Sequence, residues 1–173
     1  LLSVFERISL VERKYLKQTR KKNARIVLFG CHRMGNVFLR HFRNHDESVV
    51  VIDHNPETIE SLMDKGVDCV YGDCTNIEVL KKINIGNARI VISAVPNLDI
   101  NEFLLKYAKK INKKVIFMAT QNHLHEALDL YEKGADYVIL PHISASEASL
   151  KLLEMALRDE KHINFVKNNH IKH

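Results

Sequence analysis

The chain has 173 residues, of which 46% are hydrophobic and 27% are charged. This length suits one domain with its own core and short extensions, and the composition excludes a wholly disordered chain. The longest apolar runs, such as Val49–Ile52, are the length of strands, so no segment predicts a membrane span. Three cysteines without a C-x-x-C pair argue against a disulfide framework and a cysteine zinc site.

The net charge of +5 belongs to the first 22 residues. This segment holds seven Lys and Arg and two Glu, so the rest of the chain sums to zero. Its apolar residues share one stripe, which predicts a basic amphipathic helix at 1–22. Such a helix can bind phosphates of lipid or nucleic acid, or its charged face can simply be solvated. The neutral remainder lacks the excess charge to wrap a duplex, so no nucleic-acid partner is expected.

Six apolar, β-branched runs recur at intervals of 20 to 26 residues, with helical patterns between them. This alternation predicts a Rossmann-like α/β fold, a doubly wound six-stranded parallel sheet with flanking N- and C-terminal helices. Asn55 and Asn76 are expected to cap helices, and Gly66 and Gly134 to close them. The six expected strands are Arg25–Phe29, Ser48–Ile52, Asp68–Val70, Ala88–Ser93, Lys114–Met118 and Asp136–Leu140.

After the last strand, residues 142–159 form an expected helix that has no following strand to cover. It can pack on its own sheet or reach a partner chain. Because the apolar residues of Ile143–Leu157 recur at helical spacing, we expect a homodimer through this segment. The polar tail, 160–173, is expected to be frayed.

The first strand leads into a loop that matches part of a dinucleotide fingerprint. Gly30 and Gly35 occupy the first and third positions of G-x-G-x-x-G, and His32 replaces the middle glycine. Free N–H groups at the start of the following helix favour a phosphate there. The alternative is a tight strand-to-helix turn without a ligand. Cys31 is more consistent with a small packing residue than with an activated thiol.

Polar residues also follow the next strands, at the edge where doubly wound sheets bind ligands. Asp53, with His54 beside it, stands where a carboxylate accepts hydrogen bonds from a ribose, although it could also cap a helix. Asp73 and Cys74 follow the third strand, and Ser93 and Ala94 end the fourth. No nucleophilic triad or phosphate-binding lysine motif occurs. His123 and His125, two residues apart, would face different sides of a helix, so no metal site is expected.

From Ala24 to Pro141 the chain resembles the TrkA-N, or regulator of potassium conductance (RCK), nucleotide-binding domain. Within that family it looks most like the cytoplasmic C-terminal domains of archaeal Kef-type monovalent cation:proton antiporters. The motifs that carry the resemblance are Ile26–Gly35, Val50–Asp53, Tyr71-Gly72-Asp73, Ala88–Ser93 and Gly134–Pro141. The resemblance implies a domain at 23–141 that binds an adenine nucleotide and gates an attached potassium or sodium transporter or channel.

The resemblance also implies roles for single residues. Asp53 and its neighbour His54 would hold the ribose, Asp73 and Cys74 would flank the adenine, and Ser93 and Ala94 would line the far side. Because a side chain at position 32 crowds a bridging pyrophosphate, AMP ranks level with NAD(H), and both rank above NADP(H). The expected phosphate loop consists of Gly30, His32, Arg33, Met34 and Gly35.

The resemblance further implies obligate dimers, with the helix at 142–159 crossing between subunits. The segment 1–22 then resembles a linker that follows a transmembrane transporter domain of the same chain, on the cytoplasmic face of the cell membrane. The chain begins with Leu1, which agrees with a fragment of a longer protein. We expect a binding module and not an enzyme. The alternative from another class is a fragment of an NAD-dependent oxidoreductase.

Overall fold

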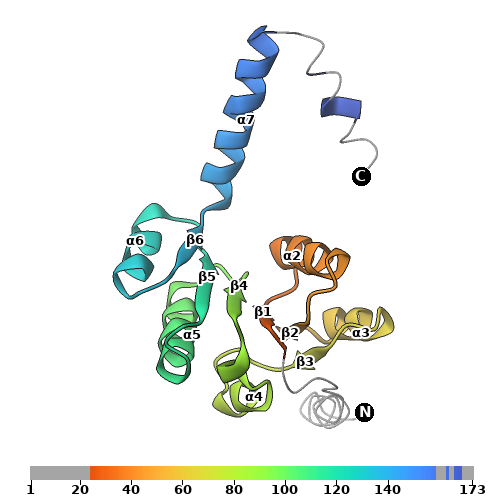
Figure 1. Cartoon of the computed structure of the whole chain (residues 1–173), viewed down its shortest axis with the longest axis vertical. Helices are drawn as coiled ribbons and strands as arrows, with labels where there is room; N and C mark the ends of the chain where they lie inside the picture. Colours follow the sequence, from red (N-terminus) through yellow and green to blue (C-terminus); the bar gives the residue numbers. More distant parts are fainter. Residues whose placement is uncertain (1–23, 159–162, 164–165, 169–173) are drawn as a thin grey trace, which may run out of the picture. The chain divides into compact units, whose positions relative to one another are not determined.

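The computed structural model describes residues 24–158, 163 and 166–168. Six parallel strands form one sheet in the order β3-β2-β1-β4-β5-β6 (Figure 1). The predicted fold class is therefore confirmed. The expected linker helix at 1–22 and most of the tail at 160–173 lie outside the described residues. The strands are β1 (Ile26–Phe29), β2 (Val49–Asp53), β3 (Cys69–Tyr71), β4 (Ile90–Ser93), β5 (Ile116–Thr120) and β6 (Tyr137–Ile139).

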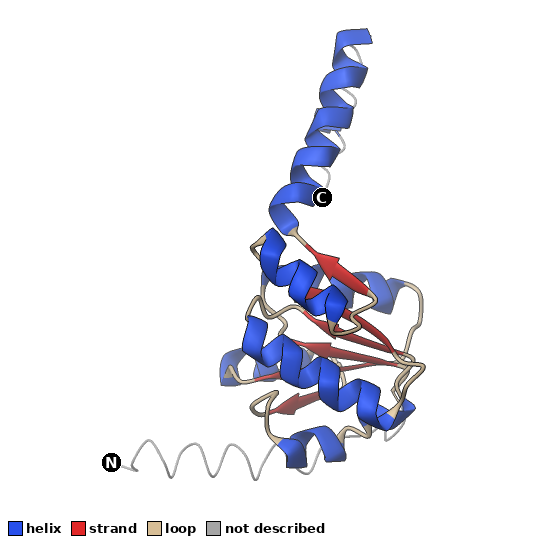
Figure 2. Cartoon of the chain, turned by 90° about the vertical axis from the view of Figure 1, so that its left-hand side faces the viewer, coloured by secondary structure: helices blue, strands red, loops and turns tan. Residues whose placement is uncertain are grey.

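Helices connect the strands and cover both faces of the sheet; Figure 2 looks onto one of these helical layers, with the strands behind it. Right-handed crossovers place α2 and α3 on one face and α4, α5 and α6 on the other, as Figure 1 shows. The helices are α2 (Arg33–Asn44), α3 (Pro56–Asp64), α4 (Ile77–Lys82), α5 (Leu98–Ile111) and α6 (Leu124–Glu132), with a short 3₁₀ turn at Ile85–Asn87 before β4.

The expected helix boundaries are confirmed. The Asn55 side chain accepts hydrogen bonds from the N–H groups of Glu57 and Thr58, and Asn76 caps α4 in the same way. Gly66 and Gly134 follow their helices with φ of +69° and +96°, a region that suits glycine. These caps fix where each helix starts and stops, and therefore where the loops emerge at the sheet edges.

The core is formed by strand residues that are buried on both faces of the sheet. The four residues of β1 and the five of β2 are all buried, as expected for the centre of a parallel sheet. Alternate side chains point to opposite faces. On the side of α2 and α3, the strand residues Ile26, Leu28, Val49 and Val51 cluster with the helix residues Leu39, Ile59 and Leu62.

A second compact unit begins at Leu140 and contains α7 (Pro141–Arg158). None of the residues of α7 is buried. Ile143, Leu150, Leu153 and Leu157 are 44% to 89% exposed, and their spacing places them on one side of the helix. Within the described ranges, none of the helices combines the length and the apolar character that crossing a bilayer requires.

Candidate functional site

The β1–α2 loop turns sharply at the carboxyl edge of the sheet. Gly30 has a φ of +79°, and its N–H donates to the Ile52 carbonyl at 2.9 Å, so the loop is tied to the end of β2. A Cβ atom at Gly30 would lie 3.0 Å from the Val95 side chain. The first glycine of the fingerprint therefore has both a conformational and a packing reason to be glycine.

Gly35 is required for the close approach of α2 to this loop. A Cβ atom there would lie 2.0 Å from the Gly30 carbonyl oxygen, which real structures do not tolerate. The third glycine thus performs the packing role that the fingerprint predicts. The first N–H groups of α2 have no acceptor within the helix, so they are available to an anion beside this loop.

Asp53 links this loop to the next one. Its Oδ2 accepts a hydrogen bond from the Cys31 N–H at 2.7 Å, and its Oδ1 accepts one from the Asn55 N–H at 2.8 Å. The residue is only 8% exposed. From the sequence, Asp53 was expected either to accept hydrogen bonds from a ribose or to cap a helix. In the structure its carboxylate accepts hydrogen bonds from two backbone N–H groups. Each carboxylate oxygen retains a further lone pair, so the structural role and binding of a ribose are both compatible with the geometry.

The β3–α4 turn brings a second carboxylate to the same edge. Asp73 Oδ1 accepts hydrogen bonds from the Thr75 N–H and from the Thr75 hydroxyl, both at 2.8 Å. These bonds, with the nearby His54, lower the pKa of Asp73 below its ordinary value. Asp73 is therefore an anion at neutral pH and acts as a hydrogen-bond acceptor.

A cavity of about 290 Å³ lies between these loops. Five of the predicted site residues line it: Gly30, Asp53, His54, Asp73 and Cys74. Its volume is at the lower end of the range for small-molecule pockets. With two carboxylates and apolar walls, the cavity suits a neutral group with hydroxyl donors better than a phosphate. The remaining lining residues are Ile52, Gly72, Val95 and Ile100.

The other predicted site residues lie outside this lining. His32 is exposed just before α2 and makes no side-chain cap, and Arg33 lines a different groove, between α2 and α3. Ser93 is fully buried, with its hydroxyl 3.4 Å from the Val95 N–H, so its side chain faces the protein interior. Met34 and Ala94 are half-buried.

Ile100 is a lining residue that sequence reasoning missed. It lies in the first turn of α5, and the signal that could have found it is its position just after the fourth strand, at the edge where ligands bind. Val95 and Gly72 stood beside predicted residues, but their contribution to the wall follows only from the folded loops.

The thiols of the site are in their neutral form. Burial, reinforced by Asp53, raises the pKa of Cys31 to about 11, and burial with the adjacent Asp73 raises that of Cys74 to about 11. Neither is an activated nucleophile at neutral pH. The packing role predicted for Cys31 is therefore consistent with the structure.

The histidine pair departs from the expectation. His123 precedes α6 in an extended conformation, so its ring stacks on that of His125 at a centroid distance of 5.5 Å instead of facing another side. In the part of the chain that the structure describes, no three His, Cys, Asp or Glu side chains gather closely enough to hold a metal ion.

Comparison with known proteins agrees with this geometry. The family model of the TrkA-N domain matches residues 26–141, from β1 to the start of α7. Potassium channel protein 1 of Methanocaldococcus jannaschii is 29% identical over 76% of this chain and 40% of its own length. The glutathione-regulated potassium-efflux system protein KefC of Cronobacter sakazakii is 24% identical over 92% of this chain and 25% of its own. The chain thus spans less than half the length of these relatives.

Solved structures share the fold. The TrkA-N domain of inner membrane protein ybaL from Escherichia coli has a TM-score of 0.72 and 23% identity, covering 76% of this chain and 97% of that one. A Kef C-terminal domain from Shewanella denitrificans in an AMP-bound form has a TM-score of 0.65 and 16% identity, covering 85% and 93%. The GsuK channel bound to NAD has a TM-score of 0.63 and 19% identity, covering 81% and 28%. The glycine loop, the sheet order and the family match together establish that this chain belongs to the TrkA-N domain family.

Proposed function

We propose that this chain is the nucleotide-binding regulatory domain of a larger potassium channel or potassium-efflux protein. Support comes from the family match and from relatives that are named as a potassium channel and a potassium-efflux system. Those relatives are much longer than this chain, so the partner in this proposal is a transmembrane transporter domain of the same polypeptide. The likeness to Kef-type antiporters leads us to propose monovalent cation:proton exchange for that partner, at the cytoplasmic face of the membrane.

The proposed ligand is an adenine nucleotide, and the observation that carries this proposal is the cavity beside the glycine loop. Ribose hydroxyls would donate to Asp53, and the adenine would be flanked by Asp73 and Cys74 and lie against Val95 and Ile100. The two carboxylates repel phosphate, which would lie instead at the Gly30–Gly35 loop, on the N–H groups of α2. This division places each part of the nucleotide in an environment of complementary charge.

Within that class we propose AMP or NAD(H) as the regulatory ligand, ahead of NADP(H). No Arg follows Asp53 to receive a 2′-phosphate. The volume of about 290 Å³ and the inward-facing Ser93 favour the mononucleotide, because they offer little for a second nucleoside. A domain that gates a transporter needs to bind its nucleotide but not to react with it, so it needs no activated nucleophile. The NAD-dependent oxidoreductase alternative gains no support from relatives named for potassium transport.

We also propose that the chain pairs through Ile143–Leu157. The support is the exposed apolar side of α7, since large exposed apolar patches mark interaction surfaces. Two copies joined there would report ligand binding to two transporter subunits, and the basic segment 1–22 would be the linker to the membrane domain.

A calorimetric titration of AMP, ADP, ATP, NAD and NADH tests the proposal. We expect AMP or NAD(H) to bind, and Asp53→Ala to weaken that binding by about 1.5–3 kcal/mol, the worth of hydrogen bonds to a charged group. Lys113→Ala, in the exposed loop before β5, is the matched control and should leave the affinity unchanged. If no adenine nucleotide binds the wild-type chain, the proposed function is wrong.

A further inference from the structure

A second cavity, between α2 and α3, has a different chemical character from the nucleotide cavity. Its volume is about 620 Å³, roughly twice that of the cavity beside Asp53. Four of its nine lining residues are cations, and none is acidic. Apolar side chains complete the walls. The lining residues are Arg33, Asn36, Val37, Leu39, Arg40, Arg43, Asn44, Leu62 and Lys65.

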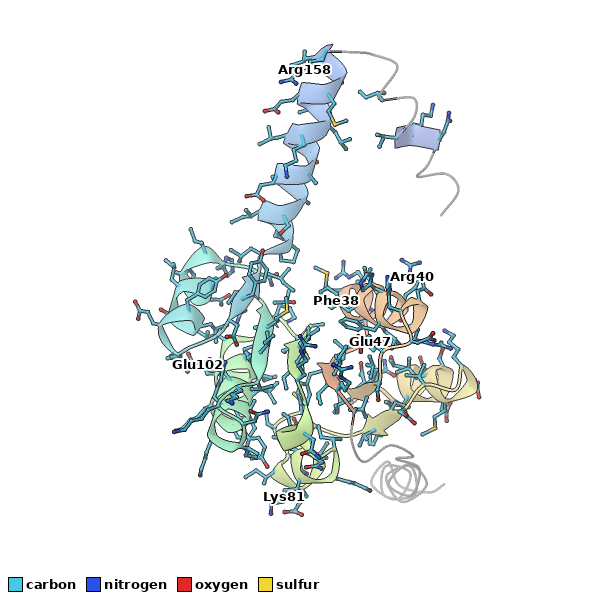
Figure 3. All side chains as sticks on the ribbon, viewed as in Figure 1. Phe38, Arg40, Glu47, Lys81, Glu102 and Arg158 are labelled. Atoms are coloured by element: carbon cyan, nitrogen blue, oxygen red, sulfur yellow. The ribbon has the colours of Figure 1, made fainter. Side chains whose placement is uncertain are left out.

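The cations are arranged along one side of α2. Arg33, Arg40 and Arg43 recur at helical spacing, with Asn36 and Asn44 on the same side. Figure 3 shows Arg40 on α2, away from the sheet. The Arg43 guanidinium donates to the Lys65 carbonyl at 3.1 Å, which ties the end of α3 to α2 and places Lys65 at the groove. The groove therefore rests on two helices that are anchored to each other.

Among the residues that the structure describes, these four cations have no carboxylate partner. Three lysines elsewhere in the domain, Lys81, Lys109 and Lys133, pair with Glu78, Asp136 and Glu102. None of the ion pairs among the described residues includes Arg33, Arg40, Arg43 or Lys65. Because residues 23–173 have no net charge, the positive charge at the groove is segregated and not part of a general excess. Unpaired like charges lining one groove repel one another until an anion joins them.

The donors define the class of anion. Guanidinium groups bind the oxygens of phosphate in pairs, and an ammonium and two amide groups add further donors. From Arg33 to Arg40 is seven residues, roughly 10 Å of helix, so a single phosphate does not reach both ends. We propose that the α2–α3 groove is a binding site for a ligand with clustered phosphates, either a soluble polyphosphate or the phosphorylated headgroups of anionic lipid. This site goes beyond the proposed adenine-nucleotide function and shares only Arg33 with it.

The test removes charge from the groove without touching the nucleotide site. The groove variant is Arg40→Gln with Lys65→Gln, because both residues are exposed, Arg33 belongs to the phosphate loop and Arg43 holds α3 in place. The control variant is Lys113→Gln with Lys114→Gln, an equal loss of charge in the exposed loop between α5 and β5. Circular dichroism checks that both variants remain folded.

Calorimetry with tripolyphosphate gives the first result. We expect the groove variant to bind at least about tenfold more weakly than wild type, because two charge-assisted contacts are lost. The control variant should match wild type. AMP titrated into the groove variant should bind as it does to wild type, so failure here is distinguishable from failure of the proposed function. Equal losses in both variants would show diffuse charge attraction and overturn the site.

Sedimentation with vesicles identifies the source of the phosphates. Vesicles of neutral phosphatidylcholine are compared with vesicles that also contain phosphatidylglycerol. Groove-dependent binding of tripolyphosphate supports a soluble ligand, and groove-dependent binding of the anionic vesicles alone supports lipid headgroups. If neither probe binds, the proposal is wrong. It is also wrong if binding of a poly-glutamate peptide requires Arg40 and Lys65 while binding of both phosphate probes does not. That second result would assign the groove to an acidic protein segment.

Discussion

Asp53 has a structural role in the site in addition to its proposed role in binding the ligand. Its carboxylate satisfies the N–H groups of Cys31 and Asn55, which belong to two different loops. A buried donor that loses its acceptor costs about 1–3 kcal/mol. The residue therefore matters before any ligand arrives.

Asp53→Ala should consequently lower the free energy of unfolding of the ligand-free protein by about 1–3 kcal/mol. Chemical denaturation monitored by circular dichroism measures this. His54→Ala is the neighbouring control, because the His54 side chain is 89% exposed and should change stability little. An Asp53→Ala variant as stable as wild type would mean that the two N–H groups find water instead.

Asp73 predicts a pH dependence of stability. Its folded-state pKa is lowered by the Thr75 hydrogen bonds, so the unfolded chain takes up the proton first as the pH falls. The stabilisation is present above the ordinary value of 3.8 and is lost as the pH drops below it. Denaturation between pH 6 and about pH 3 should show a steeper loss for wild type than for Asp73→Asn. If the free energy of unfolding falls equally steeply with pH in both proteins, Asp73 does not contribute to the pH dependence.

His32 tests the preference between ligands. If its side chain crowds a bridging pyrophosphate, His32→Gly should strengthen NAD(H) binding relative to AMP by restoring close backbone approach. Calorimetry on both ligands measures the ratio. Equal changes in the two affinities, or a selective loss of NAD(H), would contradict the steric explanation.

At the scale of elements, α7 carries a prediction of its own. Leu153 lies on its exposed apolar side with Leu150 and Leu157. Leu153→Asp would bury a charge at the proposed seam, a cost of several kcal/mol. Sedimentation equilibrium should find a dimer for wild type and a shift to monomer for Leu153→Asp. Ser144→Asp, on the polar side of the helix with Glu147 and Lys151, is the control and should remain dimeric. A monomeric wild type would refute pairing through this helix.

The strands could be predicted to within two residues because apolar β-branched runs and helix caps mark them locally. The errors have local causes. The expected fifth strand began at Lys114, but the Val115 N–H bonds to the Asn112 carbonyl and closes a turn first, so β5 is Ile116–Thr120. The sixth strand was expected to include Leu140, but β6 ends at Ile139, because Pro141 begins α7.

The site was predictable only in part. Gly30, Gly35, Asp53 and Asp73 stand at fixed distances from strand ends, and parallel strands bring such positions to one edge. The inward orientation of Ser93, the double role of Asp53 and the wall formed by Ile100 depend on packing between segments that are distant in sequence. A sequence pattern contains no information on those contacts.

Across the molecule, acidic and basic side chains gather at different proposed binding sites. The acidic cavity at the sheet edge, the glycine loop at α2 and the basic groove between α2 and α3 lie within one neutral domain. In the proposed account the first two hold the nucleotide and the third holds a separate phosphate ligand.

In the proposed function, the cavity beside Asp53 and the adjoining glycine loop bind an adenine nucleotide. The most direct measurement is an NMR titration of the 173-residue chain with AMP, following backbone amides. We expect saturable shifts at Gly30–Gly35, Asp53–Asn55 and Gly72–Cys74, with no shifts at Lys113 and Lys114. Saturable shifts confined to other parts of the chain, or no shifts at millimolar AMP, NAD or NADH, would contradict the proposed function.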